Sequence, residues 1–213
     1  QLLALAAASA ALADAGNPHE RTDPSKVSVV LGRGGYIGDG VARLDQRVRT
    51  AQQLVEALRS LIPDLDEDRL AQVKAEFQDR LGPERPESSI GLVPNLAASR
   101  IANRFDLRGA AYTVDAACAS SLIAVDHAVA QLQSGAVDVA LAGGVHHCHD
   151  LTLWSVFCQL RALSPTGVIR PFSRDADGIL VGEGTGLFVL KRVADAERDD
   201  DRIYAVIRGT GVA

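Results

Sequence analysis

Cys118 is the residue whose type and position offer the clearest chemistry in this sequence. A short strand is expected over 111–115, and a long helix begins just after the cysteine. Amide N–H groups at the start of a helix, together with the helix dipole, stabilise a negative charge and therefore a thiolate. The neighbouring side chains are small, so a substrate carbonyl can approach, and the N–H of Cys118 can donate to an oxyanion. The alternative is a buried structural cysteine, because free cysteines are among the most buried residues.

A nucleophilic cysteine normally needs a base, and histidine is the usual one. His127 lies nine residues further along the same helix, a rise of about 13 Å, so we expect a packed or surface residue out of reach of Cys118. Three other histidines follow the next expected strand, 137–142: His146, His147 and His149. If that strand is parallel to 111–115, they emerge at the same sheet edge as Cys118, and a Cys–His dyad is possible there.

The run 146–150, His-His-Cys-His-Asp, also contains residue types that bind metals. Adjacent side chains point in different directions, however, and no second ligand pair with zinc-like spacing occurs in the sequence. Three acidic residues of the glycine-rich stretch 171–186 could act as acids or ligands: Asp175, Asp177 and Glu183. A loop carboxylate whose hydrogen bonds are satisfied locally is the more common outcome. We therefore expect no metal site.

Composition narrows the possible classes of function. The chain has 213 residues, of which 47% are hydrophobic, and this is enough to bury a sizeable core. A net charge of −5 and an aromatic content of 4% argue against a nucleic-acid-binding surface. No stretch is long and apolar enough to span a bilayer. Three cysteines without a CxxC pair indicate free thiols in a reduced, cytoplasmic setting.

The elements around Cys118 alternate between helix and strand. Helices are expected over the opening residues as far as a glycine cap at Gly16, then over 41–61, 66–80 and 94–106, and after Cys118 as far as Gly135. The helix after Cys118 carries an apolar stripe: Leu122, Val125, Val129 and Leu132. Strands are expected over 27–31, 111–115, 137–142, 186–193 and 203–208. The glycine-rich loop 32–40 does not match GxGxxG, so we interpret it as tight turns. This pattern indicates an α/β fold, with one domain as the default.

Four ordered motifs resemble one enzyme family. Residues 114–122, VDAACASSL, resemble the active-site signature of type I polyketide synthase ketosynthases. Residues 170–186, RPFSRDADGILVGEGTG, resemble a second signature of the family, and 140–145 (ALAGGV) and 163–167 (LSPTG) occur between them in the family's order. Ordered matches are far more specific than a single motif. The sequence is therefore identified as a β-ketoacyl synthase, or ketosynthase, of polyketide or fatty-acid type.

The resemblance implies a thiolase-like fold, which in the full family has a layered αβαβα core, and a homodimer. It implies that Cys118 takes an acyl group from a phosphopantetheine thioester. A malonyl-type extender on acyl carrier protein then loses CO2 and attacks that group in a decarboxylative Claisen condensation. Phe172 would border the acyl pocket, and a core aromatic residue is its alternative interpretation. The chain is expected to bind no cofactor itself, because the carrier protein holds the phosphopantetheine.

A finer resemblance concerns the subgroup and the extent of the chain. Residues 91–105 and 144–154 resemble ketosynthases of iterative polyene-forming systems, the enediyne and polyunsaturated-fatty-acid synthases. This would make His146, His147 and His149 features of a subgroup. The motifs that hold the family's two catalytic histidines and its lysine do not occur here, and the first strand expected ahead of the opening helix is missing. The resemblance thus implies residues 1–213 to be a partial domain, the N-terminal lobe, truncated at both ends.

Two other functions stay open at this point. One is a non-catalytic module for dimer contacts or carrier-protein docking, although non-condensing relatives typically replace the cysteine that matches Cys118. The other is a self-contained thioesterase or acyltransferase, which would use Cys118 with a histidine from 146–149.

Overall fold

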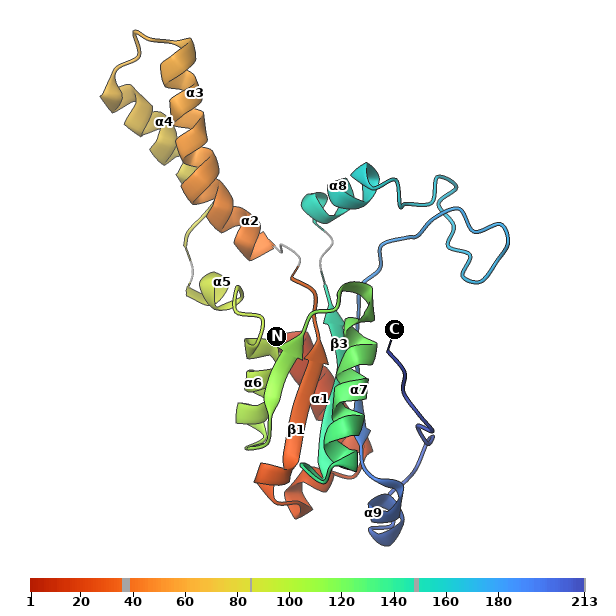
Figure 1. Ribbon diagram of the computed structural model, residues 1–213. Helices are drawn as coiled ribbons and strands as arrows, with labels where there is room; N and C mark the ends of the chain where they lie inside the picture. Colours follow the sequence, from red (N-terminus) through yellow and green to blue (C-terminus); the bar gives the residue numbers. More distant parts are fainter. Residues whose placement is uncertain (36–38, 85, 148–149, 213) are drawn as a thin grey trace. The chain divides into compact units, whose positions relative to one another are not determined.

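The computed structural model describes residues 1–35, 39–84, 86–147 and 150–212 (Figure 1). The chain divides into two compact units. The first, here called the sheet unit, consists of Gln1–Tyr36, Pro94–His147 and Leu180–Ala213. The second, here called the helical unit, consists of Ile37–Val93 and Cys148–Ile179. Cys118 belongs to the sheet unit and Phe172 to the helical unit.

The sheet unit is built on four strands in the order β2-β1-β3-β4. They are β1 (Val27–Gly32), β2 (Ala111–Val114), β3 (Val139–His146) and β4 (Gly184–Leu190). Strand β1 pairs in parallel with both β2 and β3, whereas β4 is antiparallel to β3. All six residues of β1 are buried, as expected for a central parallel strand covered on both faces. The predicted α/β class is confirmed, and the carboxyl ends of β1, β2 and β3 meet at one edge of the sheet.

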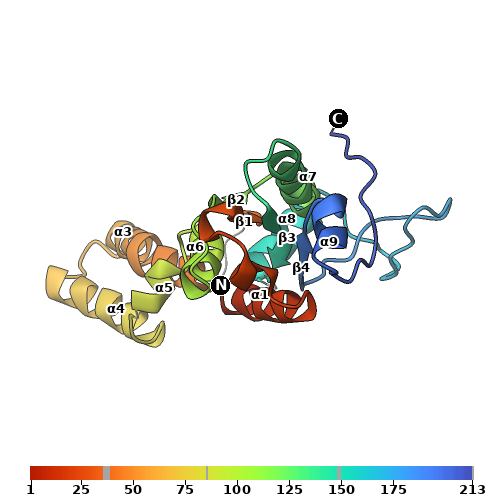
Figure 2. The ribbon, with the colours of Figure 1, turned by 90° about the horizontal axis from the view of Figure 1, so that it is seen from below.

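Helices cover both faces of this sheet (Figure 2). Helices α1 (Leu2–Asp14) and α6 (Leu96–Arg104) lie on one face, and α7 (Ser120–Gln133) lies on the other. Alternate strand residues point to the two sides: Val29 packs with the α1 and α6 side chains, whereas Ala140 packs with Ala128 of α7. The two cores therefore share the strands between them.

The face of α7 that meets the sheet differs from the predicted stripe. The buried residues of α7 are Ser120, Ala124, Ala128 and Leu132. Of the predicted stripe only Leu132 is buried, and Leu122 is 73% exposed. A face of small side chains allows the helix axis to approach the strands closely, and large apolar side chains there would hold it away. The prediction of the helix was correct, and the predicted stripe was correct in part, because Val125 and Leu132 pack on the core and Leu122 does not.

The predicted strand at 203–208 does not form. Residues 205–212 have no regular secondary structure, and Ile203, Val206 and Ile207 are exposed. A strand needs a partner to satisfy its N–H and C=O groups, and no neighbour pairs with this segment within the described residues. The residue types of this segment favour a strand, but the prediction of a strand there was wrong because β propensity depends on context.

The helical unit contains a helical hairpin followed along the chain by a short helix. Its elements are α2 (Asp39–Asp45), a π-helical turn (Gln46–Thr50), α3 (Ala51–Leu61), α4 (Glu67–Arg80), α5 (Pro86–Ile90) and α8 (Leu151–Gln159). The predicted helices at 41–61 and 66–80 are confirmed, with Asp66 as N-cap of α4 through the N–H of Arg69. In the sheet unit, the remaining helix α9 (Val193–Arg198) follows β4. Within the described residues, no helix combines the length and apolar content needed to cross a membrane.

Substitutions in α7 test its packing face. Because Ala128 is fully buried against the sheet, Ala128→Leu should reduce the free energy of unfolding by about 1–3 kcal/mol through overpacking. Leu122→Ala should change it by less than about 0.5 kcal/mol, since Leu122 is exposed. Urea denaturation of both variants measures the difference. A loss above about 2 kcal/mol for Leu122→Ala would instead support the stripe predicted from the sequence.

Candidate functional site

Cys118 lies in a tight turn between β2 and α7. It is the middle residue of a single 3-10 turn, Ala117–Ala119, that joins the end of the strand to the first turn of the helix. Its side chain is exposed. The interpretation of a buried structural cysteine is therefore wrong. The thiol lies just before a 14-residue helix, beside the first backbone N–H groups of α7.

The turn, here called the elbow (residues 115–120), contains a strained backbone. Ala117 has φ +50°, in the left-handed region, which costs a residue with a Cβ about 1–3 kcal/mol. The side chain of Ser120 holds the turn closed: its Oγ donates to the Ala117 carbonyl at 2.6 Å and accepts the Ala116 N–H at 2.9 Å. Asp115 Oδ1 accepts the Ala117 N–H at 3.0 Å. These contacts fix the peptide units on both sides of Ala117.

Two glycines bring the start of α7 onto the strand ends. A Cβ on Gly32, the last residue of β1, would lie 2.3 Å from the backbone carbon of Ser120. A Cβ on Gly144, in β3, would lie 2.7 Å from the Cβ of Ser121. Any side chain at either position would displace the helix start and the elbow with it. Gly32 begins the loop that the sequence indicated as tight turns, and its packing role comes from its contact with α7; residues 36–38 of that loop lie outside the described residues.

His146 and His147 lie at the sheet edge where the parallel strands were expected to place them. His146 ends β3, which runs parallel to β1 and, through it, parallel to β2. His147 Nδ1 lies 3.4 Å from Glu183 Oε2. Within the described residues no hydrogen bond joins Cys118 to a histidine, so the structure does not form the Cys–His dyad there. His149 lies outside the described residues.

The other sequence-level candidates have local structural roles. His127 Nδ1 is 3.2 Å from the hydroxyl of Tyr112, so its interpretation as a packed or surface residue is confirmed. Asp150 is the N-cap of α8, accepts the Thr152 N–H at 2.7 Å, and its pKa is lowered by its hydrogen bonds from Thr152. In the part of the chain that the structure describes, no three His, Cys, Asp or Glu side chains are arranged to hold a metal.

Phe172 lies in the helical unit, on the loop between Leu163 and Ile179. Its side chain is fully exposed and its φ is +61°, so it is not a core aromatic residue. Asp177 closes this loop, because its two carboxylate oxygens accept hydrogen bonds from Ser164 Oγ at 2.7 Å and Thr166 Oγ1 at 2.6 Å. The hydrogen bonds from Thr166 and Ser164 also lower the pKa of Asp177. Asp177 is thus the locally satisfied carboxylate that was expected.

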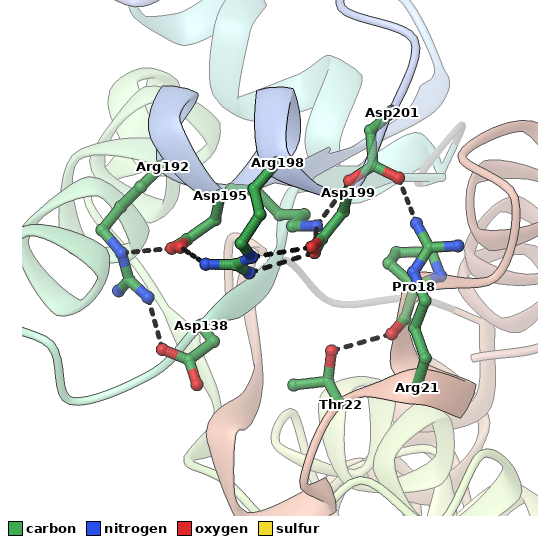
Figure 3. Close-up of polar contacts among 10 residues, drawn as sticks. Pro18, Arg21, Thr22, Asp138, Arg192, Asp195, Arg198, Asp199 and Asp201 are labelled. Atoms are coloured by element: carbon green, nitrogen blue, oxygen red, sulfur yellow. Dashed lines mark hydrogen bonds and ion pairs between the residues drawn. The ribbon is translucent and has the colours of Figure 1, made fainter.

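Cys118 follows the carboxyl end of β2, and an ion-pair cluster lies at the other end of the sheet, before β3 and after β4. Figure 3 shows the contacts within this cluster. Arg192 contacts Asp138 and Asp195, and its Nη1 donates to the carbonyls of Leu132 and Val137 at 2.9 and 2.8 Å. Further pairs join Arg198 to Asp195, Lys191 to Asp199 and Asp201, and Arg21 to Asp201. These contacts tie the end of α7, the start of β3 and helix α9 together. The cluster therefore has a structural role, because it holds these elements together.

Sequence reasoning also missed the roles of Asp115, Ser120 and the two glycines. Asp115 follows a strand directly and precedes a turn, which is the pattern of an Asx-turn, so a signal was present. Ser120 is the hydroxyl residue at the first position of α7 and is typical of a helix start. The approach of Gly32 and Gly144 to α7 is a contact between distant segments and has no local signal.

Comparison with known proteins adds a family to this geometry. The family model described as "Beta-ketoacyl synthase, N-terminal domain" matches residues 1–196. The PKS-NRPS hybrid synthetase ATPKS of Aspergillus niger is 44% identical over 133 residues, which are 62% of this chain and 7% of that protein. A phenolphthiocerol/phthiocerol polyketide synthase chain of Mycobacterium tuberculosis is 43% identical over 125 residues, 59% of this chain and 7% of that protein. The chain thus spans less than a tenth of the length of these relatives.

Two solved structures share the fold over nearly the whole chain. The ketosynthase from module 6 of the bacillaene synthase of Bacillus subtilis matches with a TM-score of 0.67 and 28% identity, and covers 94% of this chain and 28% of that chain. The PfaC keto synthase-chain length factor matches with a TM-score of 0.75 and 29% identity, and covers 95% of this chain and 21% of that chain.

The glycine contact at the elbow can be tested by adding a methyl group. Gly32→Ala should reduce the free energy of unfolding by at least about 1–3 kcal/mol, because backbone atoms of α7 cannot move aside. Gly182→Ala is the matched control, since nothing lies within 4 Å of the added Cβ. Urea denaturation of both variants is the measurement. Equal stability of the two variants would contradict the close approach of α7 to β1.

The ion-pair cluster predicts a dependence of stability on pH. The hydrogen bond from Lys191 lowers the pKa of Asp199 from 3.8 to about 2. A lowered pKa in the folded state stabilises the fold above pH 3.8, and this contribution is lost as the pH falls from 3.8 through 2. Asp199→Asn should therefore be less stable than the wild type at neutral pH, and the difference should shrink between these pH values. Denaturation from pH 7 to 2 measures it, with Asp200→Asn as the neighbouring control. A difference that does not change with pH would refute the assignment.

Proposed function

The chain belongs to the β-ketoacyl synthase family, whose N-terminal domain model covers residues 1–196, and from this premise we propose that Cys118 is its acyl-accepting nucleophile. The recognition of a ketosynthase of polyketide synthase type is confirmed by the family match and by the relatives. The thiolase-like fold is confirmed by the solved ketosynthases. The family is one of acyltransferases, and the step that this chain performs is our proposal.

The observation that carries the proposal is an exposed thiol at a strained turn before a helix. The Cys118 thiolate attacks the carbonyl carbon of an acyl phosphopantetheine thioester, and the carbonyl oxygen becomes a tetrahedral oxyanion. We propose that the N–H of Cys118 donates to this oxyanion, and its lack of a backbone acceptor within the described residues supports this. Collapse of the intermediate forms the Cys118 thioester and expels the phosphopantetheine thiolate, which takes a proton from solvent.

In the complete reaction, a malonyl-type extender on acyl carrier protein loses CO2, and the resulting carbanion attacks the Cys118 thioester. The product is a β-ketoacyl chain on the carrier protein, and the Cys118 thiolate is released. We propose that these 213 residues contribute the acyl-loading step on Cys118. Phosphopantetheine arrives on the carrier protein, and we propose no cofactor held by this chain.

Phe172 is proposed to border the acyl chain or to gate the extender step. Its full exposure and its φ of +61° support a role other than packing, because strained backbone is retained where function requires it. Asp177 holds the ends of its loop together by hydrogen bonds from Ser164 and Thr166.

The proposed partners and setting follow from the family. We propose acyl carrier protein as the source of acyl and malonyl thioesters, and a homodimer as the assembly. A cytoplasmic setting is supported by two exposed free thiols, Cys118 and Cys158. The proposed membership of the iterative subgroup is supported by the similarity to two solved proteins that combine a ketosynthase with a chain length factor: the ishigamide protein and PfaC.

Intact-protein mass spectrometry tests the nucleophile. After incubation with an acyl-pantetheine thioester, the wild type should gain one acyl group and Cys118→Ala should gain none. Cys158→Ala is the matched control, because Cys158 is also exposed but lies on α8, and it should load like the wild type. An adduct that persists in Cys118→Ala, or a folded wild type that gains none, would refute the proposal.

A further inference from the structure

We propose that Asp115 is a positioning residue that sets the orientation of Cys118 and of its N–H group. This inference rests on the proposed function of Cys118 as an acyl acceptor. Asp115 does not touch the thiol in the structure; it acts on the backbone that carries the thiol.

Each oxygen of the Asp115 carboxylate binds a different segment. Oδ1 accepts the N–H of Ala117, the strained residue just before Cys118, at 3.0 Å. Oδ2 accepts the N–H of Gly35, in the loop after β1, at 2.8 Å. The N–H of Arg33 donates to the carbonyl of Val114 at 3.0 Å. This bond extends the pairing of β1 with β2 as far as the residue before Asp115. One carboxylate therefore joins the elbow to the neighbouring strand end.

The bond to Ala117 selects which N–H group can face a substrate. Asp115 takes up the Ala117 N–H, and the next N–H, that of Cys118, has no backbone acceptor in the described residues. The left-handed φ of Ala117 sets the relative orientation of these two adjacent N–H groups. If the elbow relaxed to an ordinary φ, the peptide units around Ala117 would rotate, and the thiol and the Cys118 N–H would no longer converge on one carbonyl.

Electrostatics alone would not favour a carboxylate at this position. A negative charge near a thiolate repels it, whereas the start of α7 stabilises it. A carboxylate is nevertheless suited to this position, because it has two acceptor oxygens for two backbone N–H groups. Asparagine has one acceptor oxygen, and its NH2 group would face a second donor. The geometry thus predicts that Asp115→Asn lowers the rate of Cys118 acylation, because it removes one acceptor oxygen, even though it also removes a repulsive charge.

Two reactions of the same thiol distinguish positioning from charge. Alkylation by iodoacetamide needs an accessible thiolate and forms no oxyanion. Acyl transfer from an acyl-pantetheine thioester needs both the thiolate and the Cys118 N–H. In Asp115→Asn we expect the rate of Cys118 acylation to fall about 10- to 100-fold, while the rate of Cys118 alkylation changes less than about threefold.

A second variant keeps the charge and disturbs the same contact. A Cβ on Gly35 would lie 3.3 Å from Asp115 Oδ2, so Gly35→Ala crowds the carboxylate without removing it. It should lower acylation in the same direction as Asp115→Asn, although by less. Asp126→Asn is the control for charge on α7, because Asp126 Oδ1 accepts a hydrogen bond from Thr210 and none from the elbow. It should acylate at the wild-type rate.

The outcomes separate this inference from the proposed function. If Asp115→Asn and Gly35→Ala both acylate at the wild-type rate, the positioning role of Asp115 is overturned. It is also overturned if the rates of acylation and alkylation fall together. In either case the proposal that Cys118 is the nucleophile is unaffected. If the folded wild type is alkylated at Cys118 but never acylated, the proposed function is overturned, and the inference with it. Circular dichroism shows whether each variant is folded. If Asp115→Asn does not fold, Gly35→Ala alone decides the test.

Discussion

The close approach of α7 to the ends of β1 and β3 is the constraint on which the site depends. Gly32 and Gly144 leave no room for a side chain between the strands and the first turn of the helix, and the small residues Ala124 and Ala128 continue the contact along the sheet. This packing has two results. It buries one face of the helix against the strands, and it leaves the first N–H groups of α7 at the sheet edge, where they can act on a ligand.

The elbow converts that packing into a chemical arrangement. A strand that ends under a helix start must reverse within a few residues, and here the reversal takes place through a left-handed Ala117. Ser120 and Asp115 hold this conformation by hydrogen bonds to the backbone. Strain of this kind persists only where its surroundings determine it fully. Within this turn, the Cys118 thiol is exposed.

The two ends of the sheet illustrate different uses of polar groups. At the carboxyl ends of the parallel strands, polar groups bind the backbone and leave Cys118 accessible. At the other end, arginine and aspartate side chains pair with one another and with the carbonyls of Leu132 and Val137. Charged groups that satisfy each other stabilise a boundary between elements, whereas the thiol of Cys118 stays exposed.

The sequence by itself determined the elements, their order, the family motifs and the one thiol that stands between a strand and a helix, because these features are local and periodic. Tertiary structure alone decided which face of α7 is buried, since small residues are favoured only where a neighbour approaches closely. It also left 203–208 without a strand, because a strand exists only with a partner. The Asp115 bridge to Gly35 likewise joins residues 80 positions apart, and no local pattern encodes such a contact. The residue types thus indicated that Cys118 is the reactive group, and the packing of distant segments decided where its thiol lies.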